Sequence, residues 1–378
     1  MSTSDKTTRS VEPLFRPFPW GTTQLRNRVA MAPMTRSKSP GKVPGDDVVA
    51  YYQRRAEGGT GLIITEGTNP DHPAATAYPD VPAFYGTDAL AGWKKIVEAV
   101  HNADGAIIPQ LWHCGSFRQT GMEPDPKVPG MGPSPIGHPF HEGKGEVPHE
   151  MTQEDIDATI ASFVRAAVAA RDLGFDGIEL HGAHGYLIDQ FFWEATNQRT
   201  DRYGGSLEAR LTFAVELVQG IRAAVGADFP IVLRFSQWKL GNYECKMLPT
   251  PDELERFLLP LASAGVDVFH ASTRRFNDPE FEGSDLNLAG WAKQITGRPA
   301  MTVGSIGLDV EFIRSSFQGA PTHRAGLDDL LRRLENDEFD LVAVGRALLS
   351  DPAWADKMRD GREDEIVVYT PEHATALY

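Results

Sequence analysis

The stretch PIVLRFS, residues 230–236, is a short apolar run that contains one charged residue, Arg234. Seven similar runs occur along the chain, and a longer amphipathic segment follows each of them. Near-continuous apolar runs are typical of parallel strands that are buried on both faces. We therefore predict strands at 28–33, 61–67, 105–113, 175–181, 230–236, 266–272, 299–305 and 339–346.

Eight strand–helix units favour the α/β class and a (β/α)8 TIM barrel, which usually spans about 250 residues plus insertions. An open doubly wound sheet usually has fewer strands and a glycine-rich first turn, and no GxGxxG motif follows any of these runs. We expect residues 1–378 to form a single TIM-barrel domain. Helices are predicted near 46–57, 88–103, 152–173, 206–225, 251–264, 287–296, 309–317 and 326–335, and the last one begins within SDPAWADKM, residues 350–358.

Two segments lie outside this repeat. Residues 14–27, LFRPFPWGTTQLRN, are expected to form an N-terminal hairpin that closes the barrel floor. Residues 114–150 are rich in glycine and proline and follow the third strand. A long insertion at the carboxyl end of a barrel strand lies on the active-site face, so we expect a capping insertion there. A surface loop without a role is the alternative.

The composition restricts the partners and the compartment. The net charge of −15 argues against nucleic acid and anionic membranes as partners. Cys114 and Cys245 are too few for a disulfide framework or a cysteine-held cluster, which fits a reducing compartment. The N-terminal sequence lacks the apolar core of a signal peptide, and no apolar run is long enough to span a bilayer. We expect a soluble, cytoplasmic protein that is a monomer or a homodimer.

Polar residues and glycines gather where the predicted strands end, which is where catalytic residues of such barrels are found. Arg234 is the most informative, because a buried guanidinium needs an anionic partner. That partner is either a carboxylate, Glu179 or Glu66, or a ligand that becomes anionic. The remaining strand-end residues of interest are Pro33, Met34, Thr35, Gly67, Gln110, Trp112, His181, Gly304, Ser305, Gly345 and Arg346.

The last two strands end in Gly304–Ser305 and Gly345–Arg346. The loops after strands seven and eight are the frequent phosphate site of TIM barrels. Glycine lets backbone N–H groups approach a phosphate, and arginine binds it through two hydrogen bonds. Barrels without phosphorylated ligands also carry glycine at strand ends, so a structural role is the alternative.

The fourth strand leads into GIELHGAHGYLIDQFF, residues 177–192, in which His181, His184 and Tyr186 lie close together. Three functions are conceivable. A metal would need a third ligand, and the HExxH motif is absent. A packed structural pair is also possible. Two neutral histidines directed at one oxygen would stabilise an anion, and the tyrosine would donate a proton. The three side chains converge only if the chain turns irregularly, which Gly182 and Gly185 permit.

Four blocks in this order resemble the Old Yellow Enzyme family of FMN-dependent ene-reductases. They are RVAMAPMTRS (28–37), QLWHCG (110–115), ELHGAHGYLIDQFFWEATNQRTDRYGGSLEAR (179–210) and VGRALLSDP (344–352). The resemblance implies non-covalent FMN across the barrel mouth and NAD(P)H as reductant. It also implies reduction of the C=C bond of α,β-unsaturated carbonyl or nitro compounds, with hydride passing from the flavin to the β carbon.

The resemblance also implies roles for individual residues. Pro33, Met34, Thr35, Gly67 and Gln110 would contact the flavin ring, and Arg234 would lie beside its pyrimidine part. Gly304, Ser305, Gly345 and Arg346 would hold the phosphate. His181 and His184 would bind the oxygen of a small-molecule activated alkene, and Tyr186 would protonate its α carbon. Tyr78 and Trp112 would shape the pocket, and no metal is implied.

Thr35 places the chain nearer the family branch that carries threonine, not cysteine, at this position. The stretch RFSQWKLGNYECK, residues 234–246, departs from the Ser-Pro pair that many members carry after the arginine, so substrate range is individual here. Two alternatives remain. One is a flavoenzyme of the same fold that acts mainly on nitro compounds or nitrate esters. The other is a flavin-free TIM-barrel lyase or hydrolase, for which Lys239 is the one strand-end lysine.

Overall fold

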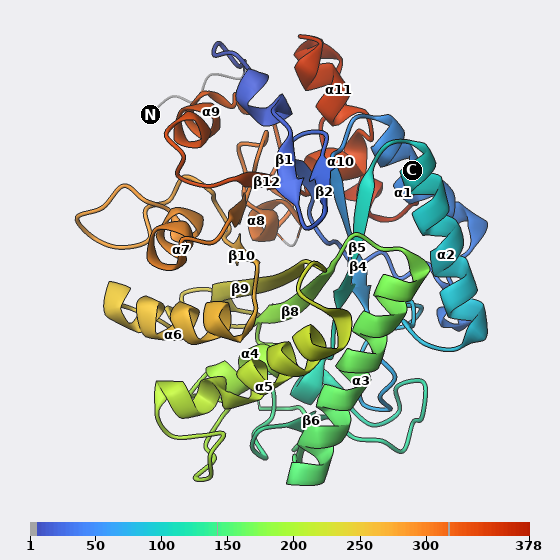
Figure 1. Cartoon of the computed structure of the whole chain (residues 1–378), viewed down its shortest axis with the longest axis vertical. Helices are drawn as coiled ribbons and strands as arrows, with labels where there is room; N and C mark the ends of the chain where they lie inside the picture. The colour runs from blue at the N-terminus through green and yellow to red at the C-terminus, as the bar shows by residue number, and fades with distance from the viewer. Residues whose placement is uncertain (1–5, 142, 317) are drawn as a thin grey trace.

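The computed structural model describes residues 6–141, 143–316 and 318–378. Eight parallel strands close into a barrel in the order β10-β11-β12-β3-β4-β5-β8-β9, with β9 paired to β10 (Figure 1). Each predicted apolar run overlaps one of these strands, so the TIM barrel is confirmed. The strands are β3 Val29–Met31, β4 Leu62–Thr68, β5 Ala106–Leu111, β8 Ile178–His184, β9 Ile231–Lys239, β10 Val268–Ser272, β11 Ala300–Val303 and β12 Leu341–Val344.

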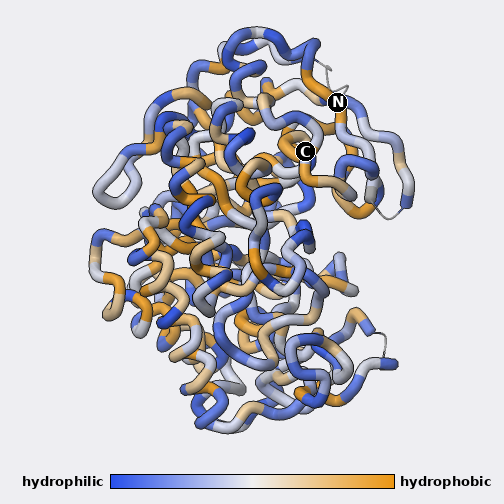
Figure 2. Tube along the Cα trace, turned by 90° about the vertical axis from the view of Figure 1, so that its right-hand side faces the viewer, coloured by the Kyte–Doolittle hydropathy of each residue, from blue (hydrophilic) through white to orange (hydrophobic). Residues whose placement is uncertain are grey.

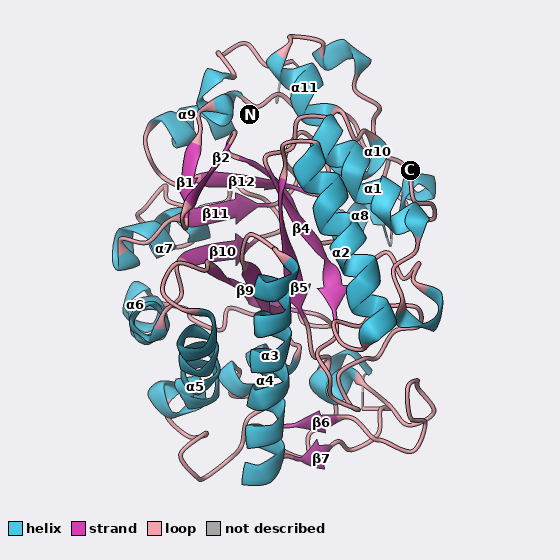
Figure 3. Ribbon diagram, turned by 45° about the vertical axis from the view of Figure 1, so that its right-hand side comes forward, coloured by secondary structure: helices cyan, strands magenta, loops and turns pink. Residues whose placement is uncertain are grey.

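Helices surround the barrel, and Figure 3 shows α1, α2 and α3 packed along one side of it. The long helices lie where they were expected: α1 Asp46–Glu57, α2 Thr87–Asn102, α3 Gln153–Leu173, α5 Leu207–Val225, α6 Pro251–Ala264, α7 Leu288–Thr296, α9 Asp328–Glu335 and α11 Trp354–Arg359. The shorter ones are α4 Leu187–Phe192, α8 Phe312–Ser316 and α10 Arg346–Ser350. The 3₁₀ turns are η1 Glu12–Phe15, η2 Pro40–Lys42, η3 Gly115–Phe117, η4 Pro139–His141, η5 Glu363–Glu365 and η6 Pro371–Ala374.

Two short helices, α4 and α10, were not predicted, because each follows its strand almost directly and covers fewer than two full turns. They matter for the site, since α4 begins after Tyr186 and α10 begins at Arg346. The expected helix at 309–317 is shorter, and its residue 317 lies outside the described residues. Residues 1–5 and 142 also lie outside the described residues. All of them belong to the expected single domain, and residue 142 also belongs to the insertion.

The amino ends of the strands are closed by a hairpin of β1 Phe18–Trp20 and β2 Thr23–Leu25, as predicted. Phe18, Trp20 and Leu25 are buried in one cluster with side chains from inside the barrel, such as Leu62 and Val232. The indole N–H of Trp20 donates to the backbone oxygen of Asp176 at 2.7 Å.

A second and larger apolar cluster lies between strands and helices. In Figure 2 hydrophilic residues colour many of the outer turns, whereas hydrophobic ones recur along the inner segments. Both clusters leave the carboxyl ends of the strands free for a site.

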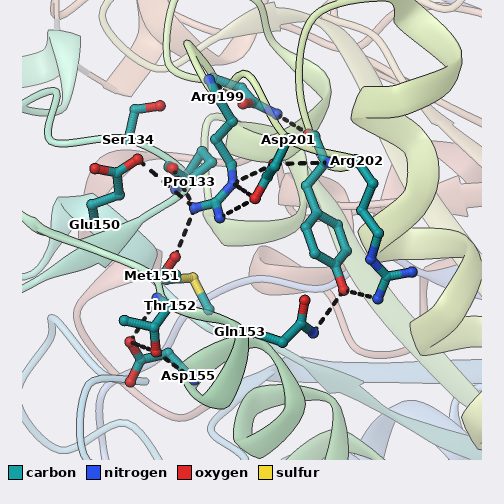
Figure 4. A network of polar contacts seen from close by, with 12 residues as sticks. Pro133, Ser134, Glu150, Met151, Thr152, Gln153, Asp155, Arg199, Asp201 and Arg202 are labelled. Carbon is teal, nitrogen blue, oxygen red and sulfur yellow. Dashed lines mark hydrogen bonds and ion pairs between the residues drawn. The ribbon is translucent and has the colours of Figure 1, made fainter.

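The insertion at 114–150 contains a small sheet of β6 Met131–Gly132 and β7 His149–Glu150, set apart from the barrel (Figure 3). Arg199, which follows α4, fastens its end by donating to the backbone oxygens of Pro133 at 3.0 Å and Met151 at 2.6 Å (Figure 4). Within the described residues, no helix has both the length and the apolarity needed to cross a bilayer.

Candidate active site

A cavity of about 510 Å³ opens at the carboxyl ends of the barrel strands. That size falls within the range of about 300–1,000 Å³ that is usual for cofactor and ligand sites. Most of the predicted site residues line it: Pro33, Met34, Thr35, Gln110, Trp112, His181, His184, Tyr186, Arg234, Gly304, Ser305, Gly345 and Arg346. The cavity therefore runs from the histidines to the end of the eighth strand.

Gly67, expected to contact the flavin ring, and Tyr78, expected to shape the pocket, are not among the residues that line the cavity. A Cβ on Gly67 would lie 2.3 Å from the Trp112 ring, so a glycine at this position leaves room for the indole. The hydroxyl of Tyr78 lies 2.8 Å from that of Tyr186. Both residues thus shape the site through a side chain that reaches it.

The end of β8 is irregular, as the glycines suggested. Its register with β9 shifts between Gly182 and His184, and His184 itself has a φ of +64°. Gly185 follows with a φ of +84°, which glycine adopts readily. As a result the ring centroids of His181 lie 5.1 Å from those of His184 and 5.0 Å from those of Tyr186. The three side chains converge on one part of the cavity.

A buried ion pair holds this turn. The ammonium of Lys239 lies 2.6 Å from Oδ1 of Asp189, and both side chains are fully buried. The other oxygen of Asp189 accepts the backbone N–H of Gly185 at 2.7 Å. Lys239 also donates to the backbone oxygen of Ser236 at 3.0 Å. Lys239, the lysine considered for a Schiff-base enzyme, therefore does not line the cavity. It links α4 to β9 instead.

Ser272, at the end of β10, connects the histidine end with the arginine below it. Its hydroxyl lies 2.8 Å from Nε2 of His184 and accepts a hydrogen bond from Arg234 at 3.2 Å. Trp238 stacks on the His184 ring at 4.3 Å and donates its indole N–H to the backbone oxygen of Ser272. One face and one nitrogen of His184 are thus fixed by residues from β9 and β10.

Burial determines the protonation of these groups. It lowers the pKa of His181 well below its ordinary value, and the charge of Arg234 lowers it further. Burial, then His181 and Arg234, do the same to the pKa of His184. Both rings are neutral near pH 7, so each carries one N–H donor. Burial also raises the pKa of Tyr186 well above its ordinary value, with Tyr78 adding to the effect. The tyrosine therefore keeps its proton.

A second polar layer lies beneath the cavity. The amide of Gln110 donates to Oε1 of Glu179 at 2.7 Å, and Nδ1 of His270 lies 2.6 Å from Oε2. Glu179 is thus engaged by these two residues, and no ion pair joins it to Arg234 among the described residues. The Nε of Arg234 is buried without a hydrogen-bond partner there. The arginine has a donor left for a ligand.

The other carboxylate that was considered for Arg234 is also occupied elsewhere. Glu66 accepts the backbone N–H groups of Arg36 and Ser37 at 2.8 and 3.0 Å. Burial raises its pKa from the ordinary value to about 7. Among the described residues, neither carboxylate forms a salt bridge with Arg234, although the charge of Glu179 acts on its pKa, and a ligand as the partner of Arg234 stays a prediction.

The far end of the cavity is built differently. Gly304 has a φ of +137°, and a Cβ there would lie 2.8 Å from the backbone oxygen of Thr273. The nearest atom to a Cβ on Gly345 would be Sδ of Met34 at 3.6 Å, so this face of Gly345 opens onto the cavity. Arg346 donates to the hydroxyl of Ser305 at 3.2 Å and to the backbone oxygen of Val310 at 2.6 Å. This end presents backbone, a hydroxyl and a guanidinium.

The insertion at 114–150 lies behind the histidine end. Its described residues do not line the cavity. Phe117 packs against Tyr186 at 5.8 Å between ring centroids, and Nε2 of His138 lies 2.9 Å from the backbone oxygen of Gly185. The insertion thus supports the wall that carries Tyr186, and a role as a cap stays a prediction.

Sequence reasoning missed part of the wall. Trp238 and Leu240 come from the individual stretch 234–246, and Arg274 follows the sixth strand of the barrel. Tyr369, Pro371 and Ala374 come from the C-terminal segment, which has no strand or helix periodicity to signal it. Arg36 donates to the backbone oxygens of Ala374 and Ala376 and so brings that segment to the mouth. Arg36 is visible in the sequence as a polar residue at the end of the first strand, and Arg274 could have been found in the same way beyond the sixth.

Possible metal ligands do not gather elsewhere. Among the described residues, no three His, Cys, Asp or Glu side chains are grouped as a metal ion would require. His113, a histidine at the end of the third predicted strand, lies with its Nε2 3.1 Å from Nδ1 of His72.

Comparisons with known proteins agree on one family. Residues 13–365 match the model of the NADH:flavin oxidoreductase / NADH oxidase family. An NADH oxidase of Thermoanaerobacter brockii is 36% identical over 365 residues, which is 92% of this chain and 50% of that protein. The 12-oxophytodienoate reductase 7 of Oryza sativa subsp. japonica is 31% identical over 377 residues, covering 94% of this chain and 90% of that protein.

Solved structures give the same answer. Morphinone reductase is 28% identical with a TM-score of 0.76, over 99% of this chain and 94% of that one. Old Yellow Enzyme from Pichia sp. AKU4542 is 27% identical with a TM-score of 0.78, over 96% of this chain and 90% of that one. The chain spans about half the length of the NADH oxidase and of a metal reductase from Desulforamulus reducens that it also matches.

Proposed function

Because this chain belongs to the NADH:flavin oxidoreductase / NADH oxidase family, whose cofactor is FMN, we propose that it is an NAD(P)H-dependent ene-reductase. Its substrates are small α,β-unsaturated carbonyl or nitro compounds. The observation that carries the proposal is the convergence of two neutral histidines and one protonated tyrosine at one end of the cavity. The other end presents glycine backbone and a guanidinium, which are suited to binding a phosphate.

The residues present fit FMN. Arg234 has an unused buried donor beside the polar layer, and Gln110 has an amide at the same level. The opposite end supplies the open face of Gly345 and the guanidinium of Arg346. FMN, when bound, accepts hydride from the nicotinamide and passes it to the alkene. In this proposal Pro33, Met34 and Thr35 contact the ring, and Gly304, Ser305, Gly345 and Arg346 hold the phosphate.

His181 and His184 bind the carbonyl or nitro oxygen of the substrate. Negative charge builds on that oxygen as the β carbon accepts hydride, and two fixed donors stabilise it. The donors must be neutral imidazoles with one N–H each, which their lowered pKa values provide. Ser272 and Trp238 keep the His184 ring from turning away.

Tyr186 delivers the proton to the α carbon. Its high pKa keeps it protonated until the carbanion forms. After the transfer, the hydroxyl of Tyr78 at 2.8 Å stabilises the phenolate by donating a hydrogen bond. Trp112 closes the wall between Tyr186 and His181, at 4.9 and 5.9 Å between ring centroids.

The test is an anaerobic assay of the purified protein with NADPH or NADH. We expect a yellow protein that oxidises the nucleotide in the presence of 2-cyclohexenone and of 1-nitrocyclohexene. Replacing both His181 and His184 with alanine should lower the rate with both substrates at least about a hundredfold, since one such donor is typically worth that much. Activity that requires oxygen and ignores the alkenes would contradict the proposal.

Tyr186→Phe separates the proton from the anion site. Reduction of the flavin by the nucleotide should be unchanged, because no proton is delivered in that half-reaction. Reoxidation by the enone should slow, and reoxidation by the nitroalkene should slow less, because its nitronate can leave and be protonated in water. Stopped-flow measurement of each half-reaction checks this, and an undiminished enone half-reaction would remove the tyrosine from the mechanism.

A further inference from the structure

The cavity wall has an unusual charge balance. Its charged side chains are Arg36, Arg234, Arg274 and Arg346, and no carboxylate lines it among the described residues. The chain as a whole carries a net charge of −15. A cleft with charge of one sign concentrates ligands of the opposite sign. The wall is therefore suited to anions in a protein that otherwise repels them.

Three of the four arginine side chains donate hydrogen bonds to other groups of the protein. Arg36 holds the C-terminal segment through two backbone oxygens. Arg234 donates to Ser272 beside the polar layer, and Arg346 donates to Ser305 and Val310 at the phosphate end. Arg274 differs from them, because its side chain forms no hydrogen bond with the described residues.

Within the described part of the chain, the one ion-pair partner of Arg274 is an exposed carboxylate. Its guanidinium lies 3.7 Å from Oε1 of Glu244, whose side chain is 91% exposed. Exposed ion pairs of this kind contribute roughly 0–1 kcal/mol. A ligand anion that is less exposed to water can therefore replace Glu244 at little cost.

The backbone of Arg274 is fixed between the two ends of the cavity. The hydroxyl of Ser305 donates to its carbonyl oxygen at 3.0 Å. Two residues earlier, Ser272 is bonded to His184. The side chain leaves this anchor toward Glu244, which belongs to the individual stretch 234–246. The side chain therefore lines the cavity on the side of the stretch 234–246, which also supplies Trp238 against the His184 ring.

We propose that Arg274 binds an anionic group, a phosphate or a carboxylate, of the ligand that enters the cavity beside the cofactor, and that this group displaces Glu244. The guanidinium presents paired donors that match either oxyanion. The proposal rests on the proposed function, in which this ligand is first the nicotinamide dinucleotide and then the alkene. The phosphates of the dinucleotide and the carboxylate of an acidic enone are the two sources.

The experiment titrates the FMN-loaded protein with ligands that do not react. Tetrahydro-NADP and tetrahydro-NAD supply the phosphates, and p-cresol is a neutral ligand for the histidine end. For the other source, the Michaelis constant of 4-oxo-2-pentenoate is compared with that of its methyl ester. Arg274→Gln should weaken binding of the phosphate or the carboxylate ligands about tenfold, as expected for a hydrogen bond to a charged group. It should leave p-cresol and the ester unchanged.

Three further variants sharpen the result. Glu244→Gln removes the competing carboxylate and should tighten the same ligands a few-fold. Arg298→Gln removes one positive charge from an exposed position just before β11, at the amino end of the barrel, and should change nothing. Arg274→Lys keeps the charge without the paired donors and should recover part of the affinity.

The outcomes separate the sources. A loss confined to the dinucleotides assigns the phosphate, and one confined to the carboxylate assigns the acidic enone. The proposal is overturned if Arg274→Gln binds every ligand as tightly as the parent, if the neutral ligands weaken equally, or if it is FMN that is released. Binding needs no turnover, so a protein that binds tetrahydro-NADP through Arg274 but reduces no alkene would sink the proposed function alone.

Discussion

The two ends of the cavity are built by different means. At the histidine end, two of the three side chains are held by a partner from another element, His184 by Ser272 and Tyr186 by Tyr78. The Lys239–Asp189 pair holds the turn between them. The end that we propose for the phosphate presents backbone and one guanidinium, because Gly304 and Ser305 directly follow β11, and Gly345 and Arg346 directly follow β12.

The difference shows where precision is needed. An end that must place a donor at one atom depends on distant residues that fix side chains. An end that holds a symmetric oxyanion needs only accessible donors at strand ends. We therefore expect distant substitutions to damage the histidine end, and only local ones to damage the phosphate end.

The largest effect is expected for Lys239→Met. It would leave the fully buried carboxylate of Asp189 without its ammonium, and breaking such a pair typically costs about 3–5 kcal/mol. The free energy of unfolding from urea titrations at pH 7 measures the loss. Lys95→Met is the matched control, because its partner Asp46 is exposed and the change should be below about 1 kcal/mol. Equal losses in the two variants would show that the buried pair does not hold the turn.

Arg346→Ala should come next, and it acts on the other end. Hydrogen bonds to a charged group are worth about 1.5–3 kcal/mol, so FMN affinity should fall at least about tenfold. Flavin fluorescence of the dialysate measures the release. The rate per bound FMN with 2-cyclohexenone should stay near the parent value, because the histidine end is intact. Full retention of FMN would contradict the phosphate assignment.

Lowering the pH should destabilise the histidine end. Burial lowers the pKa values of His181, His184 and His113 well below 6.5, and that of His138 to about 4. In the unfolded chain these groups bind protons near pH 6.5, whereas in the folded chain they do not. The unfolded state then binds more protons, so stability falls as the pH is lowered from about 6.5 toward 4.

Glu66 acts in the opposite direction between about pH 7 and 4.5, since its raised pKa lets the folded state bind the extra proton. Burial also lowers the pKa values of His72 and His270. It raises those of Asp189 and Glu280, and the hydrogen bond to Asp176 raises that of His101. The six histidines with a lowered pKa outnumber the four groups with a raised one, so we expect the net slope to keep its sign. Urea titrations at pH 7, 6 and 5 measure it. The double variant His181→Gln/His184→Gln should show a shallower slope, and a parent stability that stays flat would refute the assignment of neutral rings.

The smallest effect is expected for Tyr78→Phe. It removes the hydroxyl beside Tyr186 but keeps the stacked ring, and a neutral hydrogen bond is worth about 0.5–1.5 kcal/mol. The enone half-reaction should slow by no more than about tenfold, well short of the effect of Tyr186→Phe. Stopped-flow traces of the two variants side by side decide this. A loss as large as that of Tyr186→Phe would make Tyr78 part of the proton transfer itself.

The barrel and much of the site could be predicted because both follow from local patterns. Each strand could be recognised as an apolar run. Polar residues at the ends of these runs, such as Gln110 and Arg346, could be recognised as candidate site residues. The sequence did not reveal that Gly67 leaves room for the ring of Trp112, a residue 45 positions later. Ser272 ends a predicted strand, yet nothing in its surroundings reveals that it joins His184 to Arg234.

By itself, the sequence determined the eight strands, the floor hairpin, the family resemblance and many of the residues that line the cavity. Hydrophobic periodicity and strand-end chemistry act over a few neighbouring residues, so they can be read along the chain. Only the tertiary structure decided which partners these residues have: Asp189 for Lys239, Glu179 for Gln110, Ser272 for His184, and an exposed Glu244 for Arg274. These pairs form because closure of the barrel brings together side chains that are distant in the sequence. Whether the partner is buried or exposed then determines the protonation state and the mobility of each side chain.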